Sequence, residues 1–136
     1  MFASSGRTPA RRRPLILVVE DQEELRRLYV EHLAACGFAV IEAGNGEDAI
    51  FHTSSHRPDV VLMDLSLPVL DGWEATRRLK ADPTTRAICI VAVTGHTESS
   101  HVASAASAGC DRFLTKPCPP ETLLREVRAC IERHRR

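Results

Sequence analysis

The stretch PDVVLMDLSLP, residues 58–68, combines the two features on which the prediction of the fold rests. Residues 60–63 form a short apolar run between Asp59 and Asp64, and together with the loop that contains Pro68 they predict a strand at 59–63 buried on both faces. The run ends on an acid, Asp64, where the strand should leave the core. A carboxylate at the end of a buried strand needs an explanation, and the rest of the chain supplies one.

Four further apolar runs flank this stretch, and segments with helical spacing separate them. Strands are predicted at 15–19, 38–43, 88–93 and 112–115. Helices are predicted at 22–36, 47–56, 72–81 and 98–108 and from Pro119-Pro120 onward, with Gly37 ending the first and Asp71 capping the third. This alternation predicts an α/β fold, a doubly wound five-stranded parallel sheet with helices on both faces.

Length and composition bound the organisation of the chain. Its 136 residues suit one domain, which we place at 15–136, and residues 1–14 have the composition of a disordered basic arm. Zero net charge argues against nucleic-acid binding, and the arginines at 11–13 fit a solvated tail better than a phosphate contact. No apolar run reaches membrane-spanning length. Five cysteines without a C-x-x-C pair argue against a disulfide framework or a zinc site and favour a reducing cytoplasm.

Charged and hydroxyl residues follow the predicted strands. In a parallel sheet the carboxyl ends of the strands form one rim, where ligands bind. The second strand offers only Glu42, at a position exposed to water, and the other strand ends carry Glu20 and Asp21, Asp64, Thr94 and Lys116. Each residue alone has an ordinary explanation, such as a cap or a solvated charge. Together they predict three carboxylates, one hydroxyl and one ammonium at a single site.

The chemistry of this group points to a phosphoryl site. Three carboxylates around one point repel each other or bind a cation, and oxygen ligands without His or Cys favour Mg²⁺. Mg²⁺ keeps coordination positions for phosphate oxygens, and a carboxylate such as Asp64 can be the nucleophile that forms an aspartyl phosphate. Lys116 would neutralise a second phosphoryl oxygen, and the Thr94 hydroxyl would donate to a third.

Four blocks of the sequence resemble the receiver domain of bacterial two-component response regulators. They are ILVVEDQEELR, DVVLMDLSLPVLDGWE, IVAVTG and FLTKP in order, and the resemblance covers about residues 15–134. It implies a flavodoxin-like strand order, 2-1-3-4-5, with Asp64 as the phospho-acceptor. It also implies a cis Lys116-Pro117 bond, phosphoryl contacts from Thr94 and Lys116, and Mg²⁺ held by Glu20, Asp21, Asp64 and the Ser66 backbone carbonyl.

The same resemblance implies a signalling switch that is not a turnover enzyme. A histidine kinase or histidine phosphotransfer protein would phosphorylate Asp64, after which Thr94 moves toward the phosphate and Phe113 turns inward. The face formed by the fourth helix, fifth strand and fifth helix would then bind a protein target or a second phosphorylated copy. Phe113 replaces a commoner Tyr, and Gly95 replaces a usual Ala, which should leave the phosphate more accessible. His96 lies near the same entrance.

Three alternatives remain open at this stage. The chain is expected to be a stand-alone receiver without a DNA-binding domain, but it could be a fragment of a longer response regulator. A phosphatase or phosphotransferase using an aspartyl phosphate usually carries a second acid two residues after the nucleophile, where this chain has Ser66. An unphosphorylated interaction module would not need the acids, Thr94 and Lys116. The sequence names neither the kinase, the target, the phosphate lifetime nor the oligomeric state.

Overall fold

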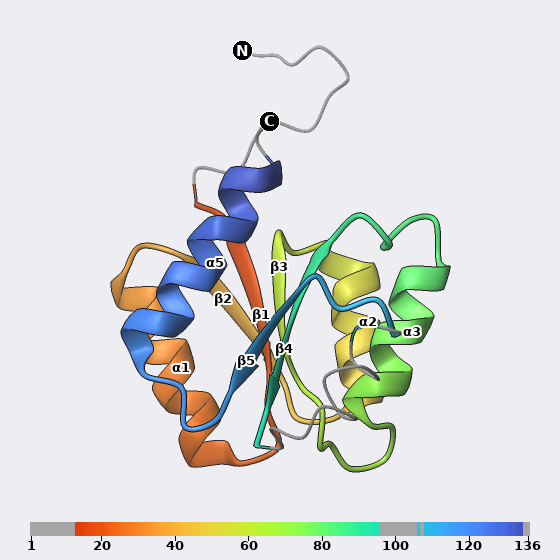
Figure 1. Cartoon of the computed structure of the whole chain (residues 1–136), viewed down its shortest axis with the longest axis horizontal. Coiled ribbons are helices and arrows are strands. Elements are labelled where there is room, and N and C mark those ends of the chain that lie inside the picture. The colour runs from red at the N-terminus through yellow and green to blue at the C-terminus, as the bar shows by residue number, and fades with distance from the viewer. Residues whose placement is uncertain (1–12, 96–105, 107, 135–136) are drawn as a thin grey trace.

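The computed structural model describes residues 13–95, 106 and 108–134, and its centre is a five-stranded sheet. All neighbouring strands pair in parallel, in the order β2-β1-β3-β4-β5 (Figure 1). The strands are β1 (Leu15–Val19), β2 (Ala39–Ala43), β3 (Val60–Asp64), β4 (Cys89–Thr94) and β5 (Arg112–Thr115). The predicted fold class and strand order are therefore confirmed, and each predicted strand boundary lies within one residue of the observed one.

Helices cover both faces of the sheet, as the continuous apolar strands predict (Figure 1). One apolar cluster joins the sheet to α1 (Glu23–Ala35) and α5 (Pro120–His134). The other joins it to α2 (Gly46–His56) and α3 (Gly72–Ala81). Every residue of β3 and β4 is buried, which fixes the two strands that end in Asp64 and Thr94. The predicted arm at 1–14 and the predicted helix at 98–108 lie almost entirely outside the described residues.

Three helix ends follow from local sequence. Asp71 caps α3, because its Oδ1 accepts a hydrogen bond of 2.9 Å from the Glu74 backbone, as predicted. Asn45 caps α2 in the same way through the Asp48 backbone, at 2.8 Å. After α1, Gly37 takes a positive φ of 97°, which matches its predicted role after the helix. The caps at Asn45 and Asp71 begin α2 and α3 at the same edge of the sheet as the acids.

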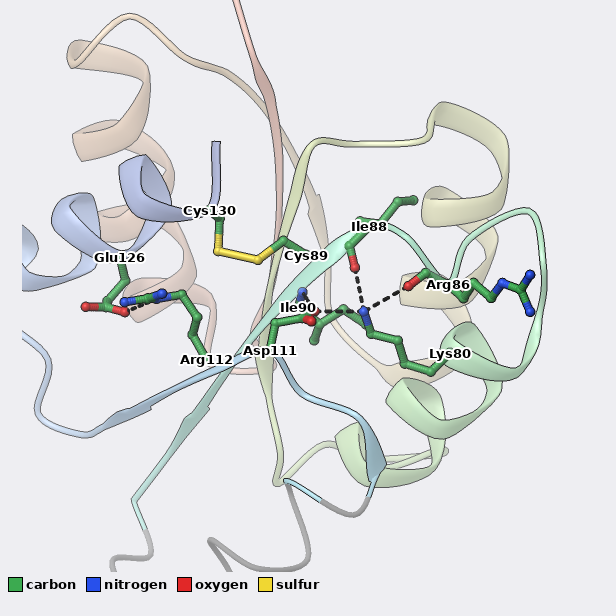
Figure 2. The surroundings of a disulfide bond; sticks show 9 residues. All are labelled: Lys80, Arg86, Ile88, Cys89, Ile90, Asp111, Arg112, Glu126 and Cys130. Atoms are coloured by element: carbon green, nitrogen blue, oxygen red, sulfur yellow. Dashed lines mark hydrogen bonds and ion pairs between the residues drawn. A yellow bond between two sulfur atoms is a disulfide. The ribbon is translucent and has the colours of Figure 1, made fainter. Parts of the chain in front are cut away.

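Two cross-links hold the elements beside β4 together (Figure 2). Cys89, the first residue of β4, forms a disulfide with Cys130 of α5, so the argument against disulfide bonds is wrong for this pair. Counting cysteines cannot show that two of them meet across a helix–sheet interface. On the other face, the Lys80 ammonium donates to Asp111 Oδ2 at 2.7 Å and to the Ile88 carbonyl at 2.8 Å. The same Asp111 oxygen accepts the Ile90 N–H at 2.8 Å.

Across residues 13–95 and 108–134, no helix has both the length and the apolar character needed to cross a bilayer.

Candidate functional site

Three acids from two strand ends meet at the rim of the sheet. One carboxylate oxygen from each of Glu20, Asp21 and Asp64 lies within 4.8 Å of the others. Asp64 is the last residue of β3, and Glu20 and Asp21 directly follow β1, its neighbour in the sheet. Glu20 and Asp64 are buried, whereas Asp21 is exposed. The structure thus brings together the three carboxylates that the sequence places after the strands.

Lys116 joins this group from the end of β5. Its ammonium donates a 2.8 Å hydrogen bond to Glu20 Oε1 and lies 3.5 Å from Asp64 Oδ2. Its backbone N–H donates to the Thr94 carbonyl at 2.8 Å, and the bond to Pro117 is cis, as the resemblance implies. Burial by itself would lower the pKa of Lys116, but the bond to Glu20 and the charges of Asp64 and Glu20 outweigh burial and raise the pKa. The ammonium therefore stays charged.

Glu20 is the most constrained of the acids. Its Oε2 accepts the Gln22 backbone N–H at 3.1 Å, in addition to the bond from Lys116 to Oε1. Burial raises the pKa of Glu20 above its ordinary value of 4.5, and the charge of Asp64 adds to this effect. The bonds from Lys116 and Gln22 lower the pKa, but by less than burial raises it. In the absence of a cation, the ionised form of Glu20 is thus costly in the folded protein.

The backbone around Asp64 is tightly packed. The Ser66 N–H donates to Asp64 Oδ1 at 3.0 Å and so orients the carboxylate. A Cβ atom on Gly72 would lie 2.2 Å from the Asp64 carbonyl oxygen, which leaves no room for a side chain there. The sequence predicts Gly72 only as the beginning of a helix. Its close approach to Asp64 comes from the tertiary structure.

The loop between Asp64 and α3 contains a strained turn. The Leu70 N–H donates to the Pro68 carbonyl at 2.8 Å, and the residue between them, Val69, has a φ of 69°. This is a γ-turn with positive φ, a rare conformation that is especially unfavourable for a β-branched residue. Val69 is 78% exposed, so packing does not compensate for the strain.

The structure describes three of the four remaining predicted residues: Thr94, Phe113 and Ser66. Thr94 is fully buried at the end of β4, in register with Thr115 of β5. Phe113 is partly buried and lines a surface cavity of about 420 Å³ together with Arg112 and Glu126. The part of Ser66 that contacts Asp64 is its N–H, so a role for its carbonyl stays a prediction. His96 lies outside the described residues.

Sequence reasoning missed Arg26, which contacts the acidic turn from α1. Its guanidinium donates to the Glu20 backbone carbonyl and to the Glu42 carboxylate, both at 2.8 Å. One signal was available, because an arginine one turn after the acids and a glutamate at the end of the second strand carry opposite charges. The bond to a backbone carbonyl has no sequence signal.

The donor set fits Mg²⁺. All three side chains offer oxygen, the ligand type that this ion prefers, and the exposed Asp21 leaves one side open to water or a phosphoryl group. With Mg–O bonds of about 2.1 Å in an octahedron, adjacent oxygens are about 3.0 Å apart and opposite oxygens about 4.2 Å apart. The three carboxylate oxygens, within 4.8 Å of one another, would therefore move closer together around the ion.

Comparisons with known proteins agree with this geometry. A family model for the response regulator receiver domain matches residues 16–128. The polar-differentiation response regulator DivK of Brucella anthropi is 31% identical over 116 residues, which are 85% of this chain and 94% of that protein. Protein PilH of Pseudomonas aeruginosa is 35% identical over 116 residues, which are 85% of this chain and 96% of that protein.

A solved structure with a bound metal ion is also similar to this chain. It is the receiver domain of a Pseudomonas aeruginosa sensor histidine kinase, with a magnesium ion coordinated in its active-site cleft. Its sequence is 31% identical and its TM-score is 0.83, with 88% of this chain and 98% of that chain covered. From the family match, the fold and these relatives, we conclude that the chain belongs to the response regulator receiver domains.

Proposed function

We propose that this receiver domain is a phosphorylation-dependent switch in which Asp64 accepts a phosphoryl group from a histidine kinase or a histidine phosphotransfer protein. The observation that carries the proposal is the meeting of three carboxylates with the Lys116 ammonium at one rim of the sheet. An ion-pair network that served stability alone would not need an exposed acid beside two buried ones. A site that receives an anionic group does need such an open side.

The proposed transfer is a displacement at phosphorus. An Asp64 carboxylate oxygen forms a bond to phosphorus while the P–N bond of the phosphohistidine breaks. The imidazole leaves with the electron pair of that bond and takes up a proton from water. The Ser66 N–H holds Asp64 Oδ1, which leaves Oδ2, the oxygen nearer Lys116, as the nucleophile in this scheme.

Positive charge and hydrogen-bond donors stabilise the transferred group. Mg²⁺, held by Glu20, Asp21 and Asp64, would neutralise charge on the phosphoryl oxygens. Lys116 already lies 3.5 Å from Asp64 and would move from Glu20 to a phosphoryl oxygen. Thr94, at the end of the neighbouring strand, would donate its hydroxyl to another.

A change in the partner-binding face would follow from the movement of Lys116 and Thr94 toward the phosphoryl group. We propose that the movement of Thr94 gives Phe113 room to turn from its partly buried position, which changes the face that includes β5 and α5. A protein target or a second phosphorylated copy would bind this face. We place the exchange in the cytoplasm, where histidine kinases present their phosphoryl group. The Cys89–Cys130 disulfide removes the cysteine argument for that location.

Labelling with acetyl phosphate and Mg²⁺, followed by intact mass, tests the proposal. The wild type should gain one phosphoryl group, and Asp64→Asn should gain none. Asp82→Asn is the control, because Asp82 ends α3 at the opposite edge of the sheet and should leave labelling unchanged. Labelling of Asp64→Asn would refute the nucleophile, and an unlabelled wild type at saturating Mg²⁺ would refute the function.

A further inference from the structure

Arg26 connects three parts of the protein at one edge of the acidic site. It lies in the first turn of α1, where its backbone N–H donates to the Gln22 carbonyl at 2.9 Å. Its Nη1 donates to the Glu20 carbonyl and its Nε to Glu42 Oε1 at the end of β2. The guanidinium therefore ties the turn after β1 to both the first helix and the neighbouring strand.

The bond to the Glu20 carbonyl fixes one particular peptide plane. That carbonyl belongs to the peptide between Glu20 and Asp21, so its direction fixes the N–Cα bond from which the Asp21 side chain is placed. On its other side, the Glu20 N–H donates to the Ala43 carbonyl at 3.1 Å. Lys116 and Gln22 hold the Glu20 carboxylate, but Asp21 is exposed. Arg26 thus fixes the backbone immediately before the exposed acid.

The surroundings of Arg26 hold the guanidinium in this position. Its side chain is 20% exposed, and its partner carboxylate on Glu42 is 50% exposed. A Cβ atom on Gly44 would lie 3.4 Å from Nη1, so the glycine leaves space for the planar group. Arginine can donate from two nitrogens in a rigid fork, which a lysine ammonium cannot reproduce.

We propose that Arg26 is a positioning residue that holds Asp21 in place for cation binding, an inference that rests on the proposed Mg²⁺-dependent function. Groups that orient metal ligands typically change metal affinity about 10- to 100-fold when removed. In this proposal the hydrogen bonds of Arg26 strengthen Mg²⁺ binding, whereas its positive charge weakens it. A positive charge beside three carboxylates disfavours Mg²⁺, so its removal would tighten binding if charge alone mattered.

Mg²⁺ titration by calorimetry separates these two effects. Arg26→Met should weaken Mg²⁺ binding about tenfold, despite the lost positive charge. The double variant Arg26→Met with Glu42→Ala removes one charge of each sign and should be weakened as well. Arg26→Lys keeps the charge without the fork and should also bind more weakly than the wild type. The matched control is Arg27→Met, because Arg27 pairs with Glu23 on the exposed side of the same helix.

Two control measurements separate a loss of stability and a loss of phosphorylation from a loss of Mg²⁺ affinity. Urea unfolding of each variant gives its stability, and titrations are compared under conditions where every variant is folded. A merely structural arginine would lower stability and leave the Mg²⁺ affinity of the folded protein unchanged. Labelling of Arg26→Met by acetyl phosphate should require a higher Mg²⁺ concentration than labelling of the wild type, in proportion to its weaker Mg²⁺ binding.

The outcomes distinguish failure of the Arg26 inference from failure of the proposed function. Unchanged or tighter Mg²⁺ binding by Arg26→Met or the double variant overturns the inference, as does full wild-type affinity in Arg26→Lys. In those cases the proposed function stands, provided that the wild type binds Mg²⁺ and is labelled. A wild type that binds no Mg²⁺ overturns the proposed function first.

Discussion

Reduction of the Cys89–Cys130 disulfide should lower the free energy of unfolding by a large fraction of its total. The bond joins the first residue of β4 to the third turn of α5 across a sequence separation of 41 residues. Both cysteines are almost fully buried, at 1% and 0% exposure. After reduction the two thiols remain in an apolar environment that suits them, so the main loss is the constraint on the unfolded chain.

The size of this loss follows from the length of the closed loop. In the chain-entropy treatment, a loop of this length removes about 13 cal/mol/K from the unfolded state, which is about 4 kcal/mol at 25 °C. A single domain has a net stability of about 5–15 kcal/mol. With a urea dependence of about 2 kcal/mol/M, the unfolding midpoint should fall by about 2 M on reduction.

Urea unfolding with and without a phosphine reductant, followed by circular dichroism, measures the effect. Alkylation of the denatured chain verifies the redox state, because the oxidised protein has three free thiols and the reduced protein has five. The control is the double variant Cys89→Ala with Cys130→Ala, whose stability should not respond to reductant. The reasoning fails if the fully reduced wild type unfolds within about 1 kcal/mol of the oxidised protein.

Three further predictions concern the rim. Gly72→Ala forces a Cβ atom against the Asp64 carbonyl, so it should cost about 1–3 kcal/mol in urea unfolding and slow acetyl phosphate labelling; wild-type behaviour in both assays would contradict the packing. In EDTA and below its ordinary pKa of 4.5, Glu20 is protonated in both the folded and the unfolded protein and does not change the stability. As the pH rises from there through the raised pKa of Glu20 in the folded protein, the free energy of unfolding falls. Glu20→Gln should remove this loss of stability. Mg²⁺ at 100 times its Kd should raise the free energy of unfolding of the wild type by about 2.7 kcal/mol at pH 7. Equal pH profiles of stability for the wild type and Glu20→Gln in EDTA would contradict the cause given for the pKa shift. Val69→Gly relieves the positive φ and should raise the urea midpoint, the relief being about 1–2 kcal/mol, whereas a lower midpoint would mean that Val69 is not strained.

The sequence predicted the features that depend on one chain segment at a time. Continuous apolar runs marked the strands, and the residues after them marked the rim, because parallel strands all end on the same side. The strand order came from the resemblance to receiver domains. The disulfide was missed because it depends on how two elements distant in the sequence pack. The bond from Arg26 to the Glu20 carbonyl is local, but a bond to a backbone carbonyl has no sequence signal. The strain at Val69 was missed because nothing in a Pro-Val-Leu sequence indicates a positive φ.

The two edge strands of the sheet, β2 and β5, each carry a charged side chain that is paired with a helix. Glu42 on β2 binds Arg26 of α1, and Arg112 on β5 binds Glu126 of α5 (Figure 2). Unpaired edge strands are the sites at which sheets of separate molecules join into aggregates, and short, charged edges resist this. These two strands have five and four residues. The charged pairs on β2 and β5 therefore protect the sheet against open-ended growth by strand addition.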